Sequence, residues 1–452
     1  MYDLLVSGGK IVARDRVYCA DIAVSGGKIA AIGENLGEAT KKIDAKGRYL
    51  FPGALDCHAH LNDPGFTWRE DFEHGSLAAA AGGVTTIIDM PLQNEPALTD
   101  AEIFRKKQEA IASKALVDYA FWGGLVDFNL DKLAGLDEAG VLAFKVFIGP
   151  VSPDYQSLNM GLIREALQIT KGFDGLIGFH AEDYSVIKHE EARAKKEGRA
   201  EWRDFLNSRP LIAEILSTQN VISLARETGA RVHICHVSHP DVAELIRQAQ
   251  HEGLPVTGET CTHYLVFSED DVLKKGSLFK CAPPLRNRDA VERLWDYVLD
   301  GTLGSVASDH SPCTEKEKCE KDHGVFGAWG GISGIQSVMQ VFFDQAVNKR
   351  GHCPSLLARR LSEDTARTFG IYGRKGALEV GFDADIVILD PDREWEITPE
   401  SLFYLNPISA FVGLKGKGLP VTTIVRGTVV FDEGERKAEF GQGELIKKIK
   451  KQ

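Results

Sequence analysis

Short apolar runs alternate with longer amphipathic stretches through the middle of this chain. Runs rich in Val, Ile, Leu and Phe are typical of strands buried on both faces of a parallel sheet. The stretches between them repeat apolar residues three and four positions apart, which is the spacing of one helix face. Strands are predicted at residues 50–57, 84–89, 117–125, 141–148, 175–180, 231–237, 255–259 and 304–309, and helices at 72–81, 100–114, 159–171, 211–227 and 240–251.

Eight strand–helix alternations between residues 51 and 372 favour an α/β fold, a (β/α)8 TIM barrel, over an open doubly wound sheet. A dinucleotide-binding open sheet would need a G-x-G-x-x-G turn after its first strand, and none follows residues 50–57. In a barrel the C-terminal ends of all strands meet at one mouth. Residues far apart in the sequence can therefore form one site there.

Both ends of the chain have a different pattern, with short β-like runs separated by tight turns. The tetrapeptide GGKI occurs at 8–11 and again at 26–29, and Gly-Gly between apolar runs is typical of a hairpin. Similar β-like runs return at 385–389 and 421–431. Because neither end alone has enough strands for a stable sheet, we expect both to form one small β-sandwich. The predicted domains are residues 1–50 plus 373–445 for the sandwich and 51–372 for the barrel.

Composition and charge narrow the possible partners. The 452 residues carry a formal net charge of -12, which disfavours nucleic acid, and the basic cluster at 447–451 is interpreted as a solvated tail. The first residues lack the features of a signal peptide, and no apolar run reaches the roughly 18 residues of a membrane-spanning helix. Eight scattered cysteines indicate reduced thiols. We expect a cytoplasmic protein with no membrane partner.

Candidate metal ligands fall at or near the predicted strand ends. Two histidines separated by one residue on a strand point to the same side, so they can bind one ion together. Each residue alone is more often structural than a ligand, but the joint pattern predicts a metal site at the barrel mouth. Its members are His58, His60, Lys145, His180, His236 and Asp309.

The motif Asp-x-His-x-His at 56–60 and the run Phe-Lys-Val-Phe at 144–147 resemble those of the amidohydrolase superfamily, in particular its cyclic-amidase branch. That branch includes dihydroorotases, hydantoinases, dihydropyrimidinases and allantoinases. The resemblance implies that CO2 converts Lys145 to an N6-carboxylated lysine, which bridges two divalent metal ions, with Zn²⁺ expected. It also implies that His58, His60 and Asp309 complete the coordination of one ion and that His180 and His236 complete that of the other. It further suggests a homotetramer.

The resemblance implies hydrolysis of a ring amide. Two cations would make hydroxide available near neutral pH and polarise the substrate carbonyl. Asp309, beside the metal and the water, is the predicted catalytic residue that takes the proton and delivers it to the departing ring nitrogen.

Departures from related patterns narrow the substrate. Dihydroorotases carry an Arg for the substrate carboxylate where this chain has Asn62, which favours a neutral substrate. Hydantoinases and dihydropyrimidinases carry a Tyr a few residues after the lysine, whereas here Tyr155 is further away. Segments 89–92, 308–313 and 328–334 resemble those of allantoinases, so the expected substrate is the small molecule allantoin and the product allantoate. A hydantoinase or dihydropyrimidinase acting on another neutral cyclic amide is the alternative, followed by an inactive scaffold.

Five polar residues are candidate substrate contacts. Gln93 and Asn94 follow the Met-Pro-Leu segment, and either amide could bind a ureido group or cap the following helix. Asn62, Ser311 and Ser333 complete the set. The charged segment 315–324 is expected to be a mobile loop over the mouth, and His263 and His310 are expected to orient ligands or substrate.

Overall fold

The computed structural model describes residues 1–148 and 155–449, and its centre is a barrel of eight parallel strands. Neighbouring strands pair in chain order, and the first and last meet where Ala59 and His310 form a parallel bridge and the His60 amide donates to the His310 carbonyl at 2.9 Å. The predicted (β/α)8 fold is therefore confirmed. The barrel strands are β8 (Ala54–Ala59), β9 (Val84–Asp89), β10 (Asp118–Gly124), β11 (Ala143–Phe147), β12 (Leu176–His180), β13 (Arg231–Ile234), β14 (Val256–Cys261) and β15 (Ser305–Ala307).

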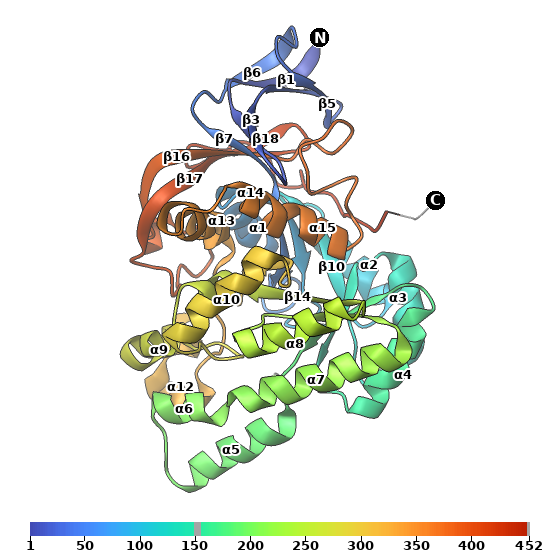
Figure 1. Ribbon diagram of the computed structural model, residues 1–452, viewed down its shortest axis with the longest axis vertical. Helices are drawn as coiled ribbons and strands as arrows, with labels where there is room; N and C mark the ends of the chain where they lie inside the picture. Colours follow the sequence, from blue (N-terminus) through green and yellow to red (C-terminus); the bar gives the residue numbers. More distant parts are fainter. Residues whose placement is uncertain (149–154, 450–452) are drawn as a thin grey trace.

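Helices surround the barrel, as the amphipathic pattern predicts (Figure 1). Side-chain caps fix where several begin: Asp71 accepts from the His74 amide, and Asp100 accepts from the amides of Glu102 and Ile103. The helices between barrel strands are α1 (Phe72–Ala81), α2 (Ala101–Ile111), α3 (Leu133–Ala139), α4 (Met160–Lys171), α5 (Tyr184–Lys196), α6 (Trp202–Ser208), α7 (Leu211–Thr228), α8 (Pro240–His251), α9 (Glu269–Lys275) and α10 (Arg288–Asp300).

Five short helices follow the last barrel strand: α11 (Glu315–Lys318), α12 (Glu320–Gly327), α13 (Val338–Phe343), α14 (Ser355–Leu357) and α15 (Asp364–Thr368). The first two occupy the segment expected to be a loop. That expectation was wrong, because Lys318, on the inner side of α11, is buried under backbone carbonyls rather than solvated. None of the described helices combines the length and the apolar composition that a membrane crossing needs.

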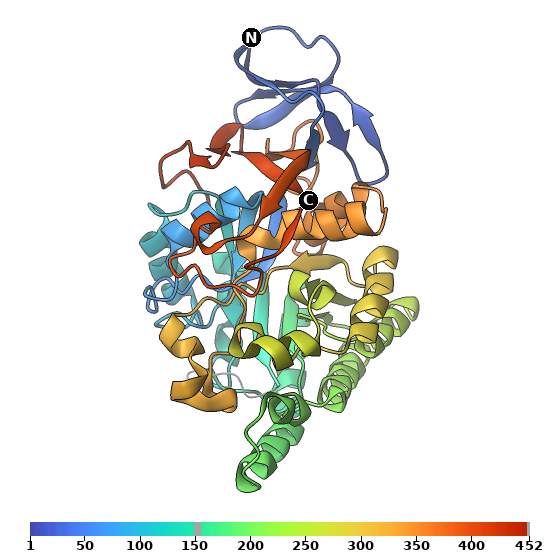
Figure 2. The same ribbon diagram turned by 90° about the vertical axis from the view of Figure 1, so that its left-hand side faces the viewer.

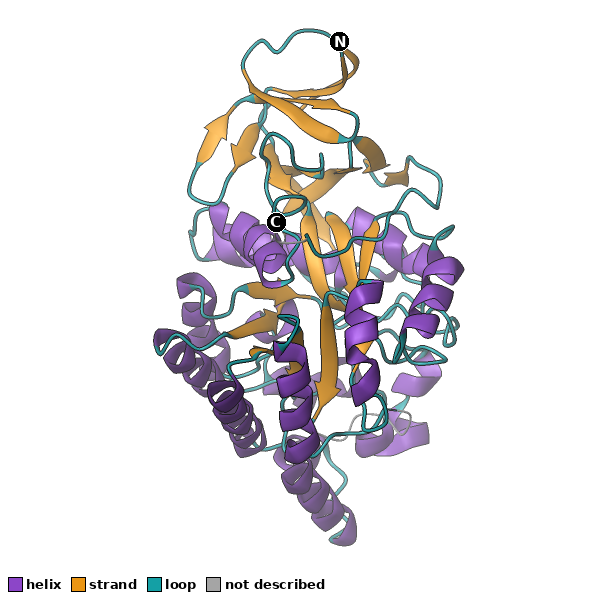
Figure 3. Cartoon of the chain, turned by 90° about the vertical axis from the view of Figure 1, so that its right-hand side faces the viewer, coloured by secondary structure: helices purple, strands orange, loops and turns teal. Residues whose placement is uncertain are grey.

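The chain ends form two further sheets that pack on each other at one end of the molecule (Figures 2 and 3). In the described part of the chain, the first sheet has four strands, all from the N-terminal segment, and the second has seven strands, from both chain ends. Apolar side chains such as Leu4, Ile22 and Ile386 fill the space between the two sheets. The predicted β-sandwich from both ends is confirmed as part of the fold class.

The strands of these sheets are β1 (Tyr2–Ser7), β2 (Lys10–Val12), β3 (Val17–Cys19), β4 (Asp21–Ser25), β5 (Lys28–Gly33), β6 (Ala39–Asp44), β7 (Tyr49–Pro52), β16 (Ile386–Glu396), β17 (Lys415–Val425), β18 (Thr428–Asp432) and β19 (Glu435–Arg436). All are short except β16 and β17. The order is β5-β4-β1-β6 in the first sheet and β19-β18-β17-β16-β7-β2-β3 in the second.

The tail after β19 returns to the barrel. The Ile446 amide donates to the Tyr119 carbonyl at 2.7 Å, and the Ile446 side chain is fully buried. Of the basic cluster, Lys447 and Ile449 are exposed, and Lys448 pairs with Asp137 at 2.6 Å at the surface, so its described part is solvated but attached to the barrel. Residues 450 and 451 of that cluster lie outside the described residues.

Candidate active site

The six predicted metal ligands come together at the C-terminal end of the barrel. His58 lies in β8, Lys145 in β11, and His180 ends β12, whereas His60, His236 and Asp309 follow the ends of β8, β13 and β15 by one or two residues. All six are at most 8% exposed. Six residues that span 252 positions of the sequence thus line one cavity of about 280 Å³.

Three of the ligands surround one point. Asp309 Oδ1 lies 3.2 Å from His58 Nε2 and 3.5 Å from His60 Nε2, so these three side chains could hold one ion. His180 and His236 form a second pair, with Nδ1 of His180 3.0 Å from Nε2 of His236. The rings of His58 and His236 are 5.2 Å apart between centroids, which places the two groups side by side.

Electrostatics keeps these side chains in ligand-competent forms. Burial, together with the Lys145 charge, lowers the pKa of His58 to about 4, and burial lowers the pKa of His180 and His236 as well. Burial alone would raise the pKa of Asp309, but the facing His58 and His60 hold it at about 2. Neutral imidazoles and an ionised carboxylate are the forms that bind a cation.

Lys145 is the unusual member of the group. Its side chain is completely buried, and its Nζ has no hydrogen-bond partner among the described residues. An isolated ammonium in such a place is costly because burial penalises the charge. The buried Nδ1 atoms of His60 and His236 are unpartnered in the same way.

A buried carboxylate behind the site fixes the orientation of His58. Glu259 accepts from His58 Nδ1, from His233 Nε2 at 3.1 Å and from Cys57 Sγ at 3.0 Å. His233 Nδ1 in turn lies 2.8 Å from the Thr257 hydroxyl. A proton on Nδ1 leaves the Nε2 lone pair of His58 directed toward Asp309 and the site.

Glu182 has a similar role behind His180. Its Oε2 lies 2.7 Å from His180 Nε2 and 2.6 Å from Arg209 Nη1. Burial alone would raise the pKa of Glu182, but Arg209 and His180 lower it to about 2, so the carboxylate stays charged. Arg209 also lines the cavity.

Left-handed backbone conformations concentrate at this site. His236 (φ 40°), Asp309 (φ 44°), Asn62 (φ 55°) and Gln93 (φ 58°) are four of the eight described non-glycine residues with positive φ. Such conformations are uncommon for residues other than glycine and cluster where the surrounding structure must direct a side chain to a function.

The five candidate substrate residues separate into two groups. Gln93 and Ser311 line the cavity, whereas Asn62, Asn94 and Ser333 are outside its lining. Asn94 holds its own loop, because its Nδ2 donates to the carbonyls of Met90 and Leu92 while its Oδ1 accepts from Lys107.

The Gln93 side chain differs from that of its neighbour. Its Oε1 is buried and has no partner among the described residues. The other three residues make local contacts: Asn62 Nδ2 donates to the His60 carbonyl, the Ser333 carbonyl accepts from the Ser409 hydroxyl, and the Ser311 carbonyl accepts from the Trp329 indole. Tyr155 is buried with its hydroxyl donating to the Lys145 carbonyl at 2.7 Å, away from the cavity lining.

Two further histidines predicted to support the site are buried beside it. His263 belongs with Cys261 and Asp309 to another group that could hold a metal ion, and both of its nitrogens lack hydrogen-bond partners among the described residues. His310 Nδ1 accepts from the Gly334 amide at 3.1 Å, and its Nε2 lies 3.5 Å from Glu70.

The barrel and the histidine-rich mouth define a hydrolase-type site built for metal ions, and comparisons with known proteins agree. The amidohydrolase family model matches residues 49–430. Allantoinases from Salmonella newport and Salmonella typhimurium are each 38% identical over 436 residues, which is 95% of both chains. The chain belongs to the amidohydrolase family, as the sequence motifs predicted.

Solved structures with the same fold are also similar in sequence. L-hydantoinase (dihydropyrimidinase) from Arthrobacter aurescens is 34% identical, with a TM-score of 0.97 over 99% of this chain and 100% of that chain. Dihydropyrimidinase from Brevibacillus agri is 29% identical, with a TM-score of 0.92 over 98% of both chains.

Sequence reasoning missed the carboxylates behind the ligands. Glu259 is the last residue of a predicted strand, and Glu182 follows His180 by two residues. A glutamate in a strand predicted to lie in the barrel is itself a signal, because burial of a carboxylate requires several donors.

Proposed function

We propose that this chain is a binuclear metal hydrolase that opens the hydantoin ring of allantoin to give allantoate. The proposal is carried by the cavity, where six ligand-type side chains and an unpartnered Gln93 amide face the same space. The 38% identity to allantoinases along nearly the whole chain supports the same substrate.

The side chains present fit a pair of divalent ions. His58, His60 and Asp309 would hold one ion and His180 and His236 the other, with Lys145 as an N6-carboxylated bridge between them. Carbamylation with CO2 would replace an unpartnered buried ammonium by an anion with two oxygens, which accounts for the isolation of Lys145 Nζ. Imidazole and carboxylate ligands favour Zn²⁺.

The residues of the chain have defined roles in the reaction. When bound, divalent ions lower the pKa of water and polarise a carbonyl. Asp309 is ionised at neutral pH, so its carboxylate can accept the proton of the attacking water and pass it to the departing ring nitrogen. The Gln93 Oε1 accepts from a ureido N–H of the substrate and orients the ring toward Asp309. Phe205 and Phe326, which line the cavity, limit access of bulk water.

Another neutral cyclic amide is the alternative substrate class, since the similar solved structures are hydantoinases and dihydropyrimidinases. The two substrate hypotheses differ in the group that Gln93 would contact, because allantoin carries a ureido group and hydantoin and dihydrouracil do not. An inactive scaffold is disfavoured because the ligand set is complete.

Parallel assays with allantoin, hydantoin, dihydrouracil and dihydroorotate test the proposal, together with metal analysis of the purified protein. We expect the highest kcat/KM with allantoin and about two ions per chain. Preferred turnover of hydantoin or dihydrouracil would establish the alternative. Turnover of dihydroorotate with allantoin inert would contradict the argument from Asn62, and a metal-free, inactive chain would indicate the scaffold.

We further propose that the enzyme works in the cytoplasm as a homotetramer. Family resemblance supports this assembly, and light scattering of the purified chain measures it directly.

A further inference from the structure

One wall of the substrate cavity is a segment with little regular structure. It runs from the end of α12 into the coil that follows, and it lines the cavity at residues 326–330. Coil carbonyls that turn away from water need donors from elsewhere in the protein. Two buried lysines supply them here.

Lys318, the last residue of α11, is 6% exposed and directs its ammonium into this wall. Its Nζ donates to the carbonyls of Gly331 at 2.6 Å and Trp329 at 3.1 Å. The same Nζ donates to the Ser277 carbonyl at 2.8 Å and lies 3.4 Å from the Lys280 carbonyl. One charge thus joins the wall to the segment after α9.

Lys280 acts on the same wall from the other side of that connection. It is 5% exposed, and its Nζ donates to the carbonyls of Ala328 at 2.6 Å and Phe326 at 2.8 Å. The ammonium also lies 4.8 Å from the centroid of the Phe205 ring, and both residues line the cavity.

Neither lysine has a carboxylate partner among the described ion pairs, so backbone carbonyls make the direct contacts to both ammonium groups, and Glu191 acts on Lys280 only through longer-range electrostatics. Burial lowers the pKa of Lys318 to about 8, and burial, with the nearby Arg209 and Lys318 charges, lowers the pKa of Lys280 to about 7. Lys318 therefore remains largely protonated at pH 7. Surface lysines seldom accept such burial without a specific structural purpose.

The wall is in turn coupled to the loop that carries Asp309. A Cβ on Gly331 would approach the Ser311 Cβ to 2.4 Å, so the two segments are in direct contact. The Trp329 indole donates to the Ser311 carbonyl at 3.1 Å, and the Arg69 guanidinium covers the indole ring at 4.2 Å. The position of the wall thus sets the space beside the reacting groups.

We propose that Lys318 and Lys280 are positioning residues that set the width of the substrate cavity by holding the 326–331 wall. Cyclic amides with large ring substituents are excluded while the wall is held. The substrate class in this statement rests on the proposed function, whereas the holding of the wall does not.

Lys318 is the better residue to change, because it lies outside the cavity lining and does not contact substrate. In Lys318→Met the stem is kept and the charge is removed. We expect backbone amides of residues 326–331 to exchange hydrogen about tenfold faster or more, since local opening becomes easier. We also expect KM for allantoin to rise about fivefold or more while kcat changes less than about threefold. The kcat/KM ratio of 5-benzylhydantoin to allantoin should rise.

Two variants serve as comparisons. Lys316→Met removes an exposed charge from the same short helix and should change neither exchange nor substrate preference. Lys318→Arg keeps charge and donors and should retain most of the protection. If Lys318→Met does not fold, Lys280→Met takes its place and should show the same faster exchange at residues 326–331.

Unchanged exchange and an unchanged substrate ratio in Lys318→Met would overturn the proposal. So would a parallel loss of kcat and of bound metal, because that result indicates general damage rather than a wider cavity. Hydrogen exchange needs no substrate, so it tests the wall even if wild-type protein fails to hydrolyse allantoin. That failure would count against the proposed function alone.

Discussion

Backbone conformation decides which of two adjacent amides faces the substrate. Gln93 and Asn94 have nearly the same chemistry, and no propensity separates them. Gln93 has a left-handed φ of 58°, and its side chain lines the cavity. The Asn94 side chain instead donates hydrogen bonds to carbonyls of its own turn. The sequence left this choice open because it depends on tertiary contacts, including the buried Lys107 that binds Asn94.

Replacing Gln93 with Ala should weaken recognition of allantoin specifically. Loss of one hydrogen bond to the ureido group should lower kcat/KM about five- to fifteenfold, and hydantoin, which lacks that group, should be affected less than about twofold. Steady-state kinetics with both substrates measure the difference. An equal loss with both would mean that Gln93 shapes the cavity without reading the ureido group.

Asp309→Asn should abolish most turnover without unfolding the chain. The amide has nearly the same shape but cannot accept a proton, so kcat should fall by about 10² to 10⁴. Circular dichroism and the thermal midpoint check that the fold is retained. A variant with near wild-type kcat would remove Asp309 from its proton-transfer role.

Glu259→Gln should lower metal affinity rather than only activity. A glutamine amide cannot accept from three donors, so His58 loses the partner that holds the proton on Nδ1. We expect Zn²⁺ affinity to fall about 10- to 100-fold, measured by competition with a chelator. Thr257→Val, at the far end of the same chain of contacts, should change it less than about threefold. Equal affinity in wild type and Glu259→Gln would refute the orienting role.

At the scale of elements, the spacing of apolar residues predicted helices and strands correctly where the buried residues follow the same spacing. The predicted ranges 84–89, 72–81 and 240–251 coincide with β9, α1 and α8. The strand predicted at 304–309 is shorter in the structure, because β15 ends at Ala307 and the chain then turns to present Asp309. The apolar pattern alone does not predict where the backbone leaves the strand conformation at the site.

The segment 315–324 shows a different limit. Its charges predicted a mobile loop over the mouth. The helices α11 and α12 form there instead, because a capping box at Thr314 starts the first helix and Lys318 donates to buried carbonyls. Composition shows that a lysine is present, but not whether carbonyls from distant segments, such as those of Ser277 and Gly331, will accept hydrogen bonds from its ammonium group. Buried lysines are therefore hard to foresee from one sequence.

The contact between the loops after β8 and β15 should depend on pH through Glu70. This carboxyl is fully buried, and burial raises its pKa to about 8. The folded protein therefore holds a proton on Glu70 between pH 4.5 and 8 that the unfolded chain releases. Its contribution to the free energy of unfolding is fully present below pH 4.5, falls by about 5 kcal/mol as pH rises from 4.5 to 8, and is absent above pH 8.

Glu70→Gln keeps the shape without the titration. We expect wild type and variant to have similar urea midpoints at pH 4.5, and the variant to become the more stable of the two as the pH rises from 6 to 9. Midpoints that shift in parallel across this range would show that Glu70 does not titrate as inferred.

At the scale of the whole molecule, the sandwich and the site lie at opposite ends of the barrel. Asp118, the first residue of β10, marks the end where the strands begin, and it contacts residues that follow the barrel in the sequence. The sequence predicted that both chain ends share a sandwich, but not that one sheet would be N-terminal alone. We propose the division into 1–50 plus 373–445 and 51–372, with the tail segment near Ile446 packed back on the barrel.

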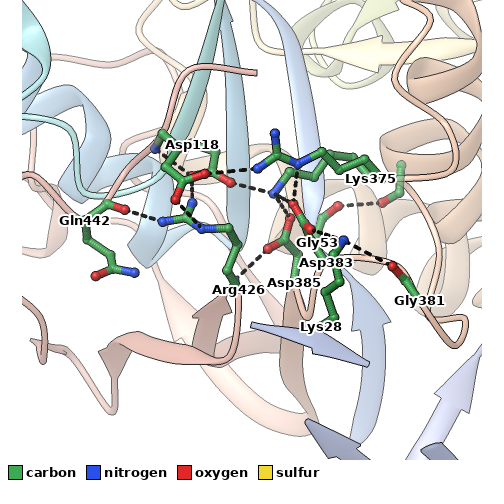
Figure 4. A network of polar contacts seen from close by, with 12 residues as sticks. Lys28, Gly53, Asp118, Lys375, Gly381, Asp383, Asp385, Arg426 and Gln442 are labelled. Atoms are coloured by element: carbon green, nitrogen blue, oxygen red, sulfur yellow. Dashed lines mark hydrogen bonds and ion pairs between the residues drawn. The ribbon is translucent and has the colours of Figure 1, made fainter. Parts of the chain in front are cut away.

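A network of buried charges joins these parts (Figure 4). Lys375 contacts Asp118 at 2.5 Å, Asp385 at 2.6 Å and Asp383 at 3.1 Å, and Arg426 contacts Asp118 from the opposite side. The side chains of Lys375 and Asp118 are completely buried, so both charges depend on the opposite charges of this network for compensation. The network therefore fixes the sandwich to the barrel through opposed charges rather than apolar contact alone.

Lys375→Met should separate stability from catalysis. The variant leaves three carboxylates without their shared cation, and removing one partner of a buried pair costs about 3–5 kcal/mol of the free energy of unfolding. Lys415→Met breaks a surface pair with Glu396, in which the lysine side chain is 69% exposed, and should cost less than about 1 kcal/mol. Calorimetry of the metal-loaded protein measures both losses. Because the network lies at the end of the barrel away from Asp309, kcat at 25 °C should stay near the wild-type value in either variant. A fall in kcat for Lys375→Met at full metal occupancy would instead show that the sandwich shapes the active site from across the barrel.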